Sequence, residues 1–371
     1  MRHSRYNGRS DLILSPFSFP KVVMFSICVL LGITLTACKP RDITEQKPQL
    51  ETQSVQTTPS HSRLSVVDSS GYRVTLKHPA QRVVCLFESS CDGLYMLNQG
   101  NKIVGIPAEI YQQPMLYHAY SVLDPRIQAK QIQSPSQGNN ATNIESLLML
   151  QPDLVIMGGG EKQTIALLRK LGIAVYIMES STYAQVKEEL SNIAVLTDAT
   201  VRAKTILQYS DQKITEIQRN TAKQPHQQTI YYAWSGGRIF STSGTQSITN
   251  DFIELAGAKN IVSTKTNQPN VNPETLIEWN PDNIVLWNTD PQLIYQRPEL
   301  QTLKSVQQRR VFNLSPAFIY NPHTIKIVLT ALYLHHHIYT EVQSSDNMKE
   351  TQYQVLSMLY GSKAAQALNA P

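Results

Sequence analysis

The first regular pattern in the chain lies at 64–76, where apolar and polar residues alternate on both sides of Ser69-Ser70-Gly71. This alternation predicts a β-hairpin. Short apolar runs follow at 82–87 and 102–106, and the stretch between them at 92–99 has a helical pattern. Because strands that alternate with helices form parallel sheets covered on both faces, the pattern predicts an α/β fold.

The later part of the chain repeats the pattern of the earlier part. Residues of matching type at 145, 147, 152, 153 and 156 recur 129 positions later, and those at 94, 97, 103 and 104 recur 158 positions later. Constant offsets within each block predict two lobes with the same order of helices and strands. The difference of 29 residues predicts an extra segment in the first lobe, at 107–142.

A long helix is expected between the two lobes. Residues 199–223 contain no glycine or proline, and apolar or small side chains at 203, 206, 207, 210, 214 and 217 share one helical face. A flexible linker would contain glycine or proline. We therefore predict a stiff connecting helix at 199–223 between Rossmann-like lobes at 63–198 and 224–371, each with a central parallel sheet. A packing helix that belongs to one lobe is the alternative.

The first 62 residues have a different character. The uncharged run at 22–37 follows Lys21, as in an export signal, and it is shorter than the ~20 residues that a membrane-spanning helix needs. Leu35-Thr36-Ala37-Cys38 resembles the lipobox of bacterial lipoproteins, in which cleavage precedes the cysteine and the thiol carries a diacylglycerol. Residues 39–62 are polar and contain three prolines. We expect a signal peptide at 1–37 and a lipidated flexible tether at 38–62; the alternatives are a membrane-spanning helix or a chance cysteine.

The charge of the chain argues against a nucleic-acid partner. The formal net charge is +5, but residues 1–37 contain four basic residues and one acidic residue. The remainder therefore carries 29 basic and 27 acidic residues, a balance of +2. Because proteins that bind DNA or RNA have a basic surface over the whole domain, we expect no nucleic-acid binding.

Two of the four cysteines belong to the folded body. Cys28 lies in the predicted leader and Cys38 at the predicted anchor, which leaves Cys85 and Cys91. Cys85 lies within an apolar strand pattern and would have to turn back across six residues to reach Cys91. We expect two free thiols, with Cys85 buried as a small apolar residue.

The chain after the leader resembles the helical-backbone (class III) substrate-binding proteins of ABC importers, which serve uptake of iron siderophores, haem, cobalamin and molybdate. The matching residues are, in order, Asp68, Gly71, Val74, Leu76, Pro79, 82–84, 143–145, 151–156, 252–262 and the long helix. The resemblance implies two α/β lobes joined by a rigid helix, a ligand in the cleft between them, and an ABC importer permease dimer as partner. It also implies that one acidic side chain of each lobe docks on the permease. The matching positions are Glu161 and Glu254; ordinary helix-surface carboxylates are the alternative.

The candidate binding residues lie where the predicted strands end. Ligands of open α/β sheets bind at the carboxyl ends of the strands, so two facing lobes form one cleft. Aromatic residues at these ends suit a large flat or chelated ligand, although packing would explain any one of them. The hydroxyl-rich loop 241–247 suits either an oxyanion or a helix cap. The predicted ligand-binding residues are Phe87, Glu88, Ser89, Ser90, Tyr111, Gly159, Trp234, Ser243, Thr245, Trp287, Tyr320 and His323.

Two groups of residues carry weaker signals for a metal. The consecutive histidines at 335–337 would point in different directions on a helix, so we interpret them as a surface feature. Hard ligands for ferric iron could come from the extra segment and the residue opposite it, namely Tyr117, His118, Tyr120, Asp124 and His323.

The expected function is that of a lipid-anchored receptor in the cell envelope, on the periplasmic or extracellular face of the cytoplasmic membrane. It would capture an iron chelate (siderophore or haem) or cobalamin and deliver it to the permease. We expect no catalytic residue and no intrinsic cofactor, because the metal is cargo. The alternatives are the same fold binding a compact oxyanion such as molybdate and, from another class, a secreted hydrolase. The chain has no G-x-S-x-G motif, and the glycines at 158–160 lack the lysine and Ser/Thr spacing of a P-loop.

Overall fold

A computed structural model describes residues 63–136, 141–234, 236–339 and 345–369. The predicted signal peptide at 1–37, the lipidation site Cys38 and the tether at 38–62 lie outside the described residues. Within the described residues, no helix is both long enough and apolar enough to span a membrane.

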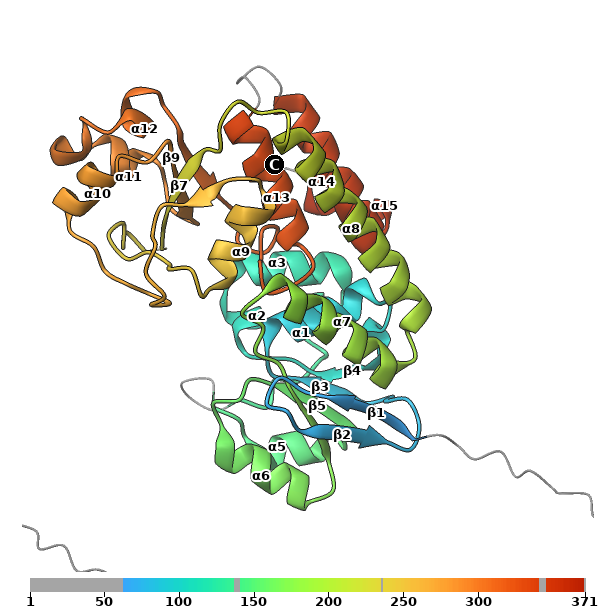
Figure 1. The fold of residues 1–371 in the computed structure, drawn as a ribbon. Helices are drawn as coiled ribbons and strands as arrows, with labels where there is room; N and C mark the ends of the chain where they lie inside the picture. The colour runs from blue at the N-terminus through green and yellow to red at the C-terminus, as the bar shows by residue number, and fades with distance from the viewer. Residues whose placement is uncertain (1–62, 137–140, 235, 340–344, 370–371) are drawn as a thin grey trace, which may run out of the picture. The chain divides into compact units, whose positions relative to one another are not determined.

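The first lobe contains a hairpin and a parallel sheet (Figure 1). The hairpin strands β1 (Leu64–Val67) and β2 (Arg73–Leu76) pair antiparallel, as the alternation predicted. The sheet has the order β4-β3-β5-β6. Its strands are β3 (Val83–Cys85), β4 (Ile103–Gly105), β5 (Leu154–Met157) and β6 (Ala174–Ile177). The accompanying helices are α1 (Glu88–Met96), α5 (Ile144–Met149), α6 (Lys162–Lys170) and α7 (Tyr183–Thr197), with the 3-10 helix η1 (Gly100–Lys102).

The second lobe repeats this topology. Its parallel sheet has the order β8-β7-β9-β10, which matches β4-β3-β5-β6 strand for strand. The strands are β7 (Thr229–Ala233), β8 (Lys259–Asn260), β9 (Asn283–Trp287) and β10 (Val311–Leu314). The helices are α9 (Ile248–Leu255), α10 (Pro273–Trp279), α11 (Gln292–Tyr295), α12 (Lys304–Gln307) and α13 (Ile327–Tyr339), with the 3-10 helix η3 (Pro298–Leu300).

One pair of repeated aspartates explains why the sequence repeat is visible. The carboxylate of Asp153 accepts hydrogen bonds from the backbone N–H groups of Gln81 and Arg82, just before β3. Asp282, 129 positions later, accepts from the backbone N–H and the hydroxyl of Thr229 at the start of β7. In each lobe the aspartate fixes the start of the neighbouring strand, so the same residue type is needed twice.

The extra segment of the first lobe is helical. It forms α2 (Glu109–Gln112), α3 (Pro114–Leu123) and α4 (Pro125–Gln128) between β4 and α5. Prolines begin both α3 and α4, where a missing backbone N–H costs nothing because the first turn has no internal acceptor. The second lobe has no helix at the corresponding place in its described residues, between β8 and α10.

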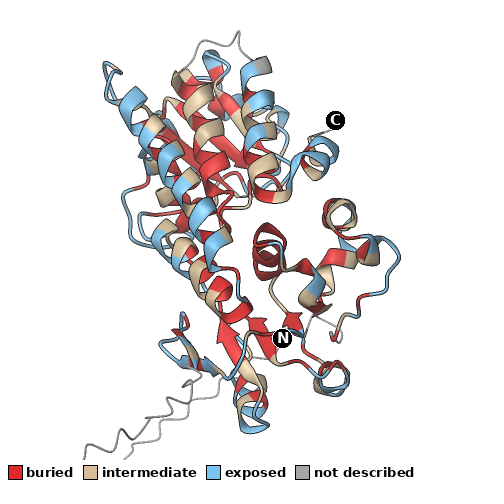
Figure 2. Ribbon diagram, turned by 90° about the vertical axis from the view of Figure 1, so that its right-hand side faces the viewer, coloured by how far each residue is buried: buried red, intermediate tan, exposed pale blue. Residues whose placement is uncertain are grey.

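The expected connecting helix is α8 (Thr200–Thr221), whose 22 residues span ~33 Å. Its buried face is formed by the small and apolar residues of the predicted stripe, Ala203, Ile206, Ser210, Ile214 and Ile217. This face lies against α7 of the first lobe and α9 and α13 of the second. Figure 2 shows that the strands are buried and that other helices, like α8, have one buried side and one exposed side.

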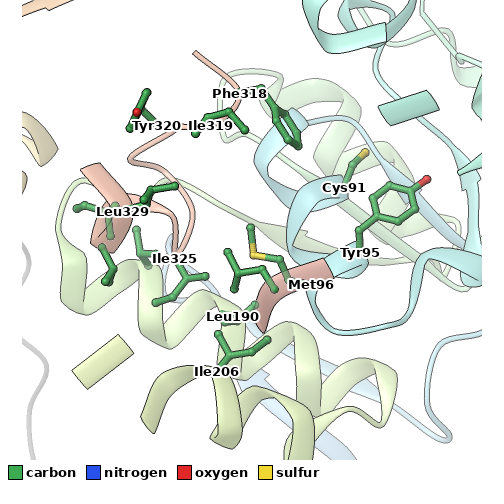
Figure 3. Close-up of a cluster of buried hydrophobic side chains, with 14 of the residues drawn as sticks. Cys91, Tyr95, Met96, Leu190, Ile206, Phe318, Ile319, Tyr320, Ile325 and Leu329 are labelled. Atoms are coloured by element: carbon green, nitrogen blue, oxygen red, sulfur yellow. The ribbon is translucent and has the colours of Figure 1, made fainter. Parts of the chain in front are cut away.

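The two lobes share a hydrophobic core as well as a connecting helix. Figure 3 shows Met96 of α1, Leu190 of α7 and Ile206 of α8 beside Ile325 and Leu329 of the second lobe. The C-terminal helices α14 (Ser345–Tyr360) and α15 (Ser362–Leu368) extend this contact, because α14 contacts α1 and α15 contacts α3. The lobes are therefore held by packing over several elements.

The two body cysteines are free, as expected. Cys85 ends β3 and Cys91 lies in α1, and both side chains are fully buried in the shared core. Burial raises the pKa of the Cys91 thiol well above its usual value.

Candidate functional site

The candidate site is a cavity of about 280 Å³ between the lobes. It lies at the carboxyl ends of β3, β7, β9 and β10, where ligands of open α/β sheets bind. Larger hollows of about 470 and 520 Å³ lie beside β2 and at the end of α1, away from these strand ends. The lining residues are Phe87, Glu88, Ser89, Glu109, Gln113, Leu116, Tyr232, Trp234, Ile248, Thr249, Trp287, Ala317, Phe318, Asn321, Pro322 and His323.

Several predicted site residues meet in this cavity. Six residues that the sequence predicts in the cleft line it, namely Phe87, Glu88, Ser89, Trp234, Trp287 and His323. They come together because each follows or ends a strand of one of the two facing sheets. Tyr232 of β7 also lines the cavity and was not predicted, although it lies two positions before Trp234 and side chains two positions apart along a strand share a face.

The walls of the cavity are aromatic and held in place. The indole N–H of Trp234 donates to the carbonyl of Thr242 at 3.0 Å, and its ring packs edge-on against Tyr232 with centroids 5.5 Å apart. Phe318 packs edge-on against Tyr120 of the extra segment, with centroids 5.4 Å apart. A ligand with a flat or apolar surface would therefore meet rings that are already ordered.

Glu88 forms the floor of the cavity at the start of α1. Its Oε1 accepts from the Tyr120 hydroxyl at 2.5 Å, and its Oε2 accepts from Asn321 Nδ2 of the second lobe at 2.7 Å. Burial, together with the nearby carboxylate of Asp92, raises the pKa of Glu88 to about 7, and the Lys326 ammonium opposes the shift. The floor is thus a titratable group that bridges the two lobes.

A fully buried ion pair lies behind this floor. Lys326 Nζ lies 2.7 Å from Asp92 Oδ2, and neither side chain has any exposed surface. Tyr360 of α14 donates its hydroxyl to the other Asp92 oxygen. The Lys326 ammonium also lies 3.5 Å from the centroid of the Phe318 ring. The ion pair joins α1 of the first lobe to the segment before α13 of the second.

Two further titratable groups line the cavity. Burial raises the pKa of Glu109, and a backbone hydrogen bond from Glu88 offsets part of the rise. Burial lowers the pKa of His323, whose Nδ1 donates to the Ser180 carbonyl at 3.1 Å. His323 is therefore held as a neutral imidazole at neutral pH.

Other predicted ligand-binding residues have partners away from the cavity. Ser90 donates its hydroxyl to the backbone carbonyl three residues earlier, and Tyr111 donates to the carbonyl of Ile132 at 2.7 Å. Tyr320 is buried and donates to the Gln352 side chain at 3.1 Å. These three do not line the cavity. Ser90 lies in α1, Tyr111 in α2 and Tyr320 in the loop after β10, and the hydroxyl of each binds a group of the protein.

The hydroxyl-rich loop at 241–247 acts as a helix cap in the structure. Ser247 accepts from the N–H of Asn250 at 3.2 Å and so caps α9. Ser243 is fully buried, and Thr245 is exposed and donates to the Thr264 carbonyl. Neither Ser243 nor Thr245 lines the cavity.

Gly159 and Glu161 lie in the turn after β5, away from the cavity. The N–H of Gly159 donates to Glu179 Oε1 at 2.8 Å. The half-buried Glu161 carboxylate accepts from the hydroxyls of Thr142 at 2.8 Å and Thr164 at 3.0 Å. The predicted docking carboxylate of the second lobe, Glu254, is exposed on α9.

The candidate iron ligands of the extra segment do not converge on one point. Tyr117 donates its hydroxyl to the Gln128 carbonyl, and Asp124 pairs with Arg126 at 2.7 Å. Tyr120 is buried against Glu88, whereas His118 is exposed. Nowhere in the described ranges do three or more His, Cys, Asp or Glu side chains form a group that could hold a metal ion.

The interpretation of His335, His336 and His337 as a surface feature is wrong. All three are half-buried on α13. His335 lies 3.0 Å from the Ala256 carbonyl, and the His337 ring packs on Tyr333 with centroids 4.0 Å apart. Burial lowers the pKa of both His335 and His337. His335 reaches the end of α9, and the His337 ring also packs against Phe312 of β10 with centroids 5.3 Å apart, so these two side chains lie between elements of the second lobe.

Two lobes with the same parallel sheet order, a single long helix between them and an aromatic cavity at facing strand ends define a class. It is the class of two-lobed substrate-binding proteins with a helical backbone. The family model described as periplasmic binding protein matches residues 83–317. The chain belongs to this family, and the resemblance drawn from the sequence is confirmed.

Comparison with individual proteins agrees with this fold. The ABC transporter substrate-binding lipoprotein YvrC of Bacillus subtilis is 21% identical over 306 residues, which cover 80% of this chain and 90% of YvrC. The molybdate periplasmic binding protein MolA of Haemophilus influenzae is 18% identical with a TM-score of 0.66, covering 80% of this chain and 97% of MolA. The vitamin B12 binding protein BtuF of Vibrio cholerae is 20% identical with a TM-score of 0.55, covering 70% of this chain and 97% of BtuF. At these identities the likeness to solved structures shows the fold.

Proposed function

We propose that this periplasmic binding protein is the receptor of an ABC importer and that its cargo is a metal chelate. The observation that carries the proposal is the cavity between the lobes, with aromatic rings from both sides. Phe87 comes from the first lobe, and Trp234 and Trp287 come from the second. Such rings bind large, partly apolar ligands because binding buries apolar surface. A binding protein of this family would retain such a ligand without converting it.

The chelate is favoured over a compact oxyanion by the contacts of the 241–247 loop. Ser247 caps α9 and Thr245 donates to the Thr264 carbonyl, and none of residues 241–247 lines the cavity, so the loop places no cluster of hydroxyl donors there. Proteins that bind molybdate and vitamin B12 share this fold, so the fold does not decide between an oxyanion and a chelate. The side chains that line the cavity must decide it.

The proposal is tested by titrating tryptophan fluorescence with ferric siderophores, haem, cobalamin and molybdate. The chain has three tryptophans, and Trp279 lies on α10 against Tyr231, outside the cavity. Quenching by a chelate should persist in Trp279→Phe and be lost when Trp234 and Trp287 are both changed to Phe. Trp287→Ala should weaken binding by about tenfold or more. Quenching that depends on Trp279 alone, or a response to molybdate only, would contradict the proposal.

The membrane anchor belongs to the same proposal. A diacylglycerol on Cys38 would hold the receptor at the outer face of the cytoplasmic membrane, beside the permease. We expect Cys38→Ser to release the protein from the membrane fraction and to abolish labelling by a radioactive fatty acid. Membrane association that survives Cys38→Ser would show a different anchor.

Docking on the permease would use Glu161 and Glu254. Glu254 is exposed and suits a direct contact, whereas Glu161 also binds two threonine hydroxyls and would present one face only. Glu254→Lys should abolish uptake and leave cargo affinity unchanged, because electrostatic complementarity steers such encounters. Glu278→Lys, an exposed charge reversal on α10, is the matched control and should transport normally. Loss of cargo binding in Glu254→Lys would instead make this carboxylate part of the binding site.

A further inference from the structure

The ionisable side chains that line the cavity are acidic, apart from His323. Two carboxyl groups line it, those of Glu88 and Glu109, and no lysine or arginine is among its described lining residues. The nearby ammonium of Lys326 is turned away and held by Asp92 at 2.7 Å. His323 is neutral, because burial lowers its pKa.

A buried site of this kind discriminates by charge. Interactions between charges are stronger in a cavity than in water, so an anionic ligand is repelled by the ionised carboxylate of Glu109 and, above about pH 7, also by that of Glu88. The aromatic walls act in the same direction, because ring faces attract cations and offer nothing to anions. A neutral or cationic ligand avoids the repulsion and keeps the apolar burial.

We propose that the cleft admits metal chelates of zero or positive net charge, such as ferric trihydroxamates, and rejects anionic chelates. The inference rests on the proposed function and names the substrate class of the same site. Glu109 is the main determinant, because it is half-exposed toward the cavity and both oxygens of Glu88 already accept hydrogen bonds. Glu109 lies in the extra segment that the second lobe lacks, so the segment supplies the selectivity.

The test is a charge series on one ligand scaffold. A linear ferric trihydroxamate with a free amine carries a net charge of +1, its N-acetyl derivative 0, and its N-succinyl derivative −1. A ferric tris-catecholate, a trianion, and neutral cobalamin complete the set. Binding to the purified protein is measured by tryptophan fluorescence and by calorimetry at low and physiological salt. We expect affinity to fall about tenfold for each unit of negative charge, and the trianion not to bind.

Variants separate charge from shape. Glu109→Gln should reduce the difference between the +1 and −1 ligands by about tenfold, while Glu278→Gln on α10 should leave it unchanged. Equal or tighter binding of the −1 ligand or of the trianion by the unmodified protein would overturn the charge inference and leave the proposed function standing. Failure of every chelate and of cobalamin to bind would overturn the proposed function itself.

Discussion

Replacing Lys326 by methionine should leave the carboxylate of Asp92 buried without its counter-charge. The pair is fully buried, with Nζ and Oδ2 2.7 Å apart. Methionine has nearly the length of the lysine side chain and removes the charge that forms the ion pair. The variant therefore tests how much of the contact between the lobes depends on this one pair.

The magnitude follows from the distance and the burial. At an effective dielectric constant of about 20, two unit charges 2.7 Å apart attract by ~6 kcal/mol. Desolvation of both ions offsets much of this gain, but removal of one partner leaves the desolvation of the other uncompensated. We expect Lys326→Met to lower the free energy of unfolding by about 3–5 kcal/mol. The double variant Asp92→Asn, Lys326→Met should lose clearly less, because no buried charge remains.

Urea unfolding followed by circular dichroism measures these differences. The matched control is Lys187→Met, because Lys187 pairs with Asp211 at 2.9 Å with both side chains partly exposed. That pair should contribute less than ~1 kcal/mol. The reasoning is refuted if Lys326→Met costs no more than Lys187→Met, or if the double variant is as unstable as the single one.

Two other predictions concern Glu88 and Gly244. Because the folded pKa of Glu88 is raised from 4.5 to about 7, its ionised form is disfavoured, and stability is lost as the pH rises through this range. Measured by urea unfolding, the free energy of unfolding of Glu88→Gln relative to that of the unmodified protein should rise by on the order of 3 kcal/mol between pH 5 and pH 8. A relative free energy that does not change with pH would contradict this. Gly244→Ala should cost ~2 kcal/mol or more in thermal or urea unfolding, because its Cβ would overlap the Thr264 and Thr266 carbonyls. Gly160→Ala, with open space around it, should change stability by less than ~0.5 kcal/mol, and equal effects would refute the packing argument.

The parts of the fold that the sequence predicts are those governed by local patterns. The hairpin, the duplicated strand order and the buried face of α8 follow from alternation, constant offsets and helical spacing. Phe87, Trp234 and Trp287 were predicted for the cleft because strand ends of facing sheets must meet. These features depend on periods and on topology, which a single sequence displays.

The parts that the sequence does not predict depend on contacts between distant segments. Lys326 begins an apolar run and gives no sign that its ammonium is buried against Asp92 of the other lobe. Glu109 and Leu116 enter the cavity because of how α2 and α3 pack, which no spacing in the sequence encodes. Tyr111 and Tyr320 were expected in the cleft because they are aromatic and lie at predicted strand ends, and their hydroxyls bind protein groups instead.

The residues that line the cavity also hold the lobes together, which connects binding to release. Asn321 of the second lobe donates to Glu88 at 2.7 Å, and His323 donates to the Ser180 carbonyl at 3.1 Å. A permease that pulled the lobes apart would break these hydrogen bonds and the aromatic contacts with the cargo in one movement. The long helix α8 alone would leave the cleft free to widen, whereas the shared core and the buried ion pair resist it. Bound cargo adds contacts to the same seam, so the closed, loaded receptor should be the form that is hardest to open without the transporter.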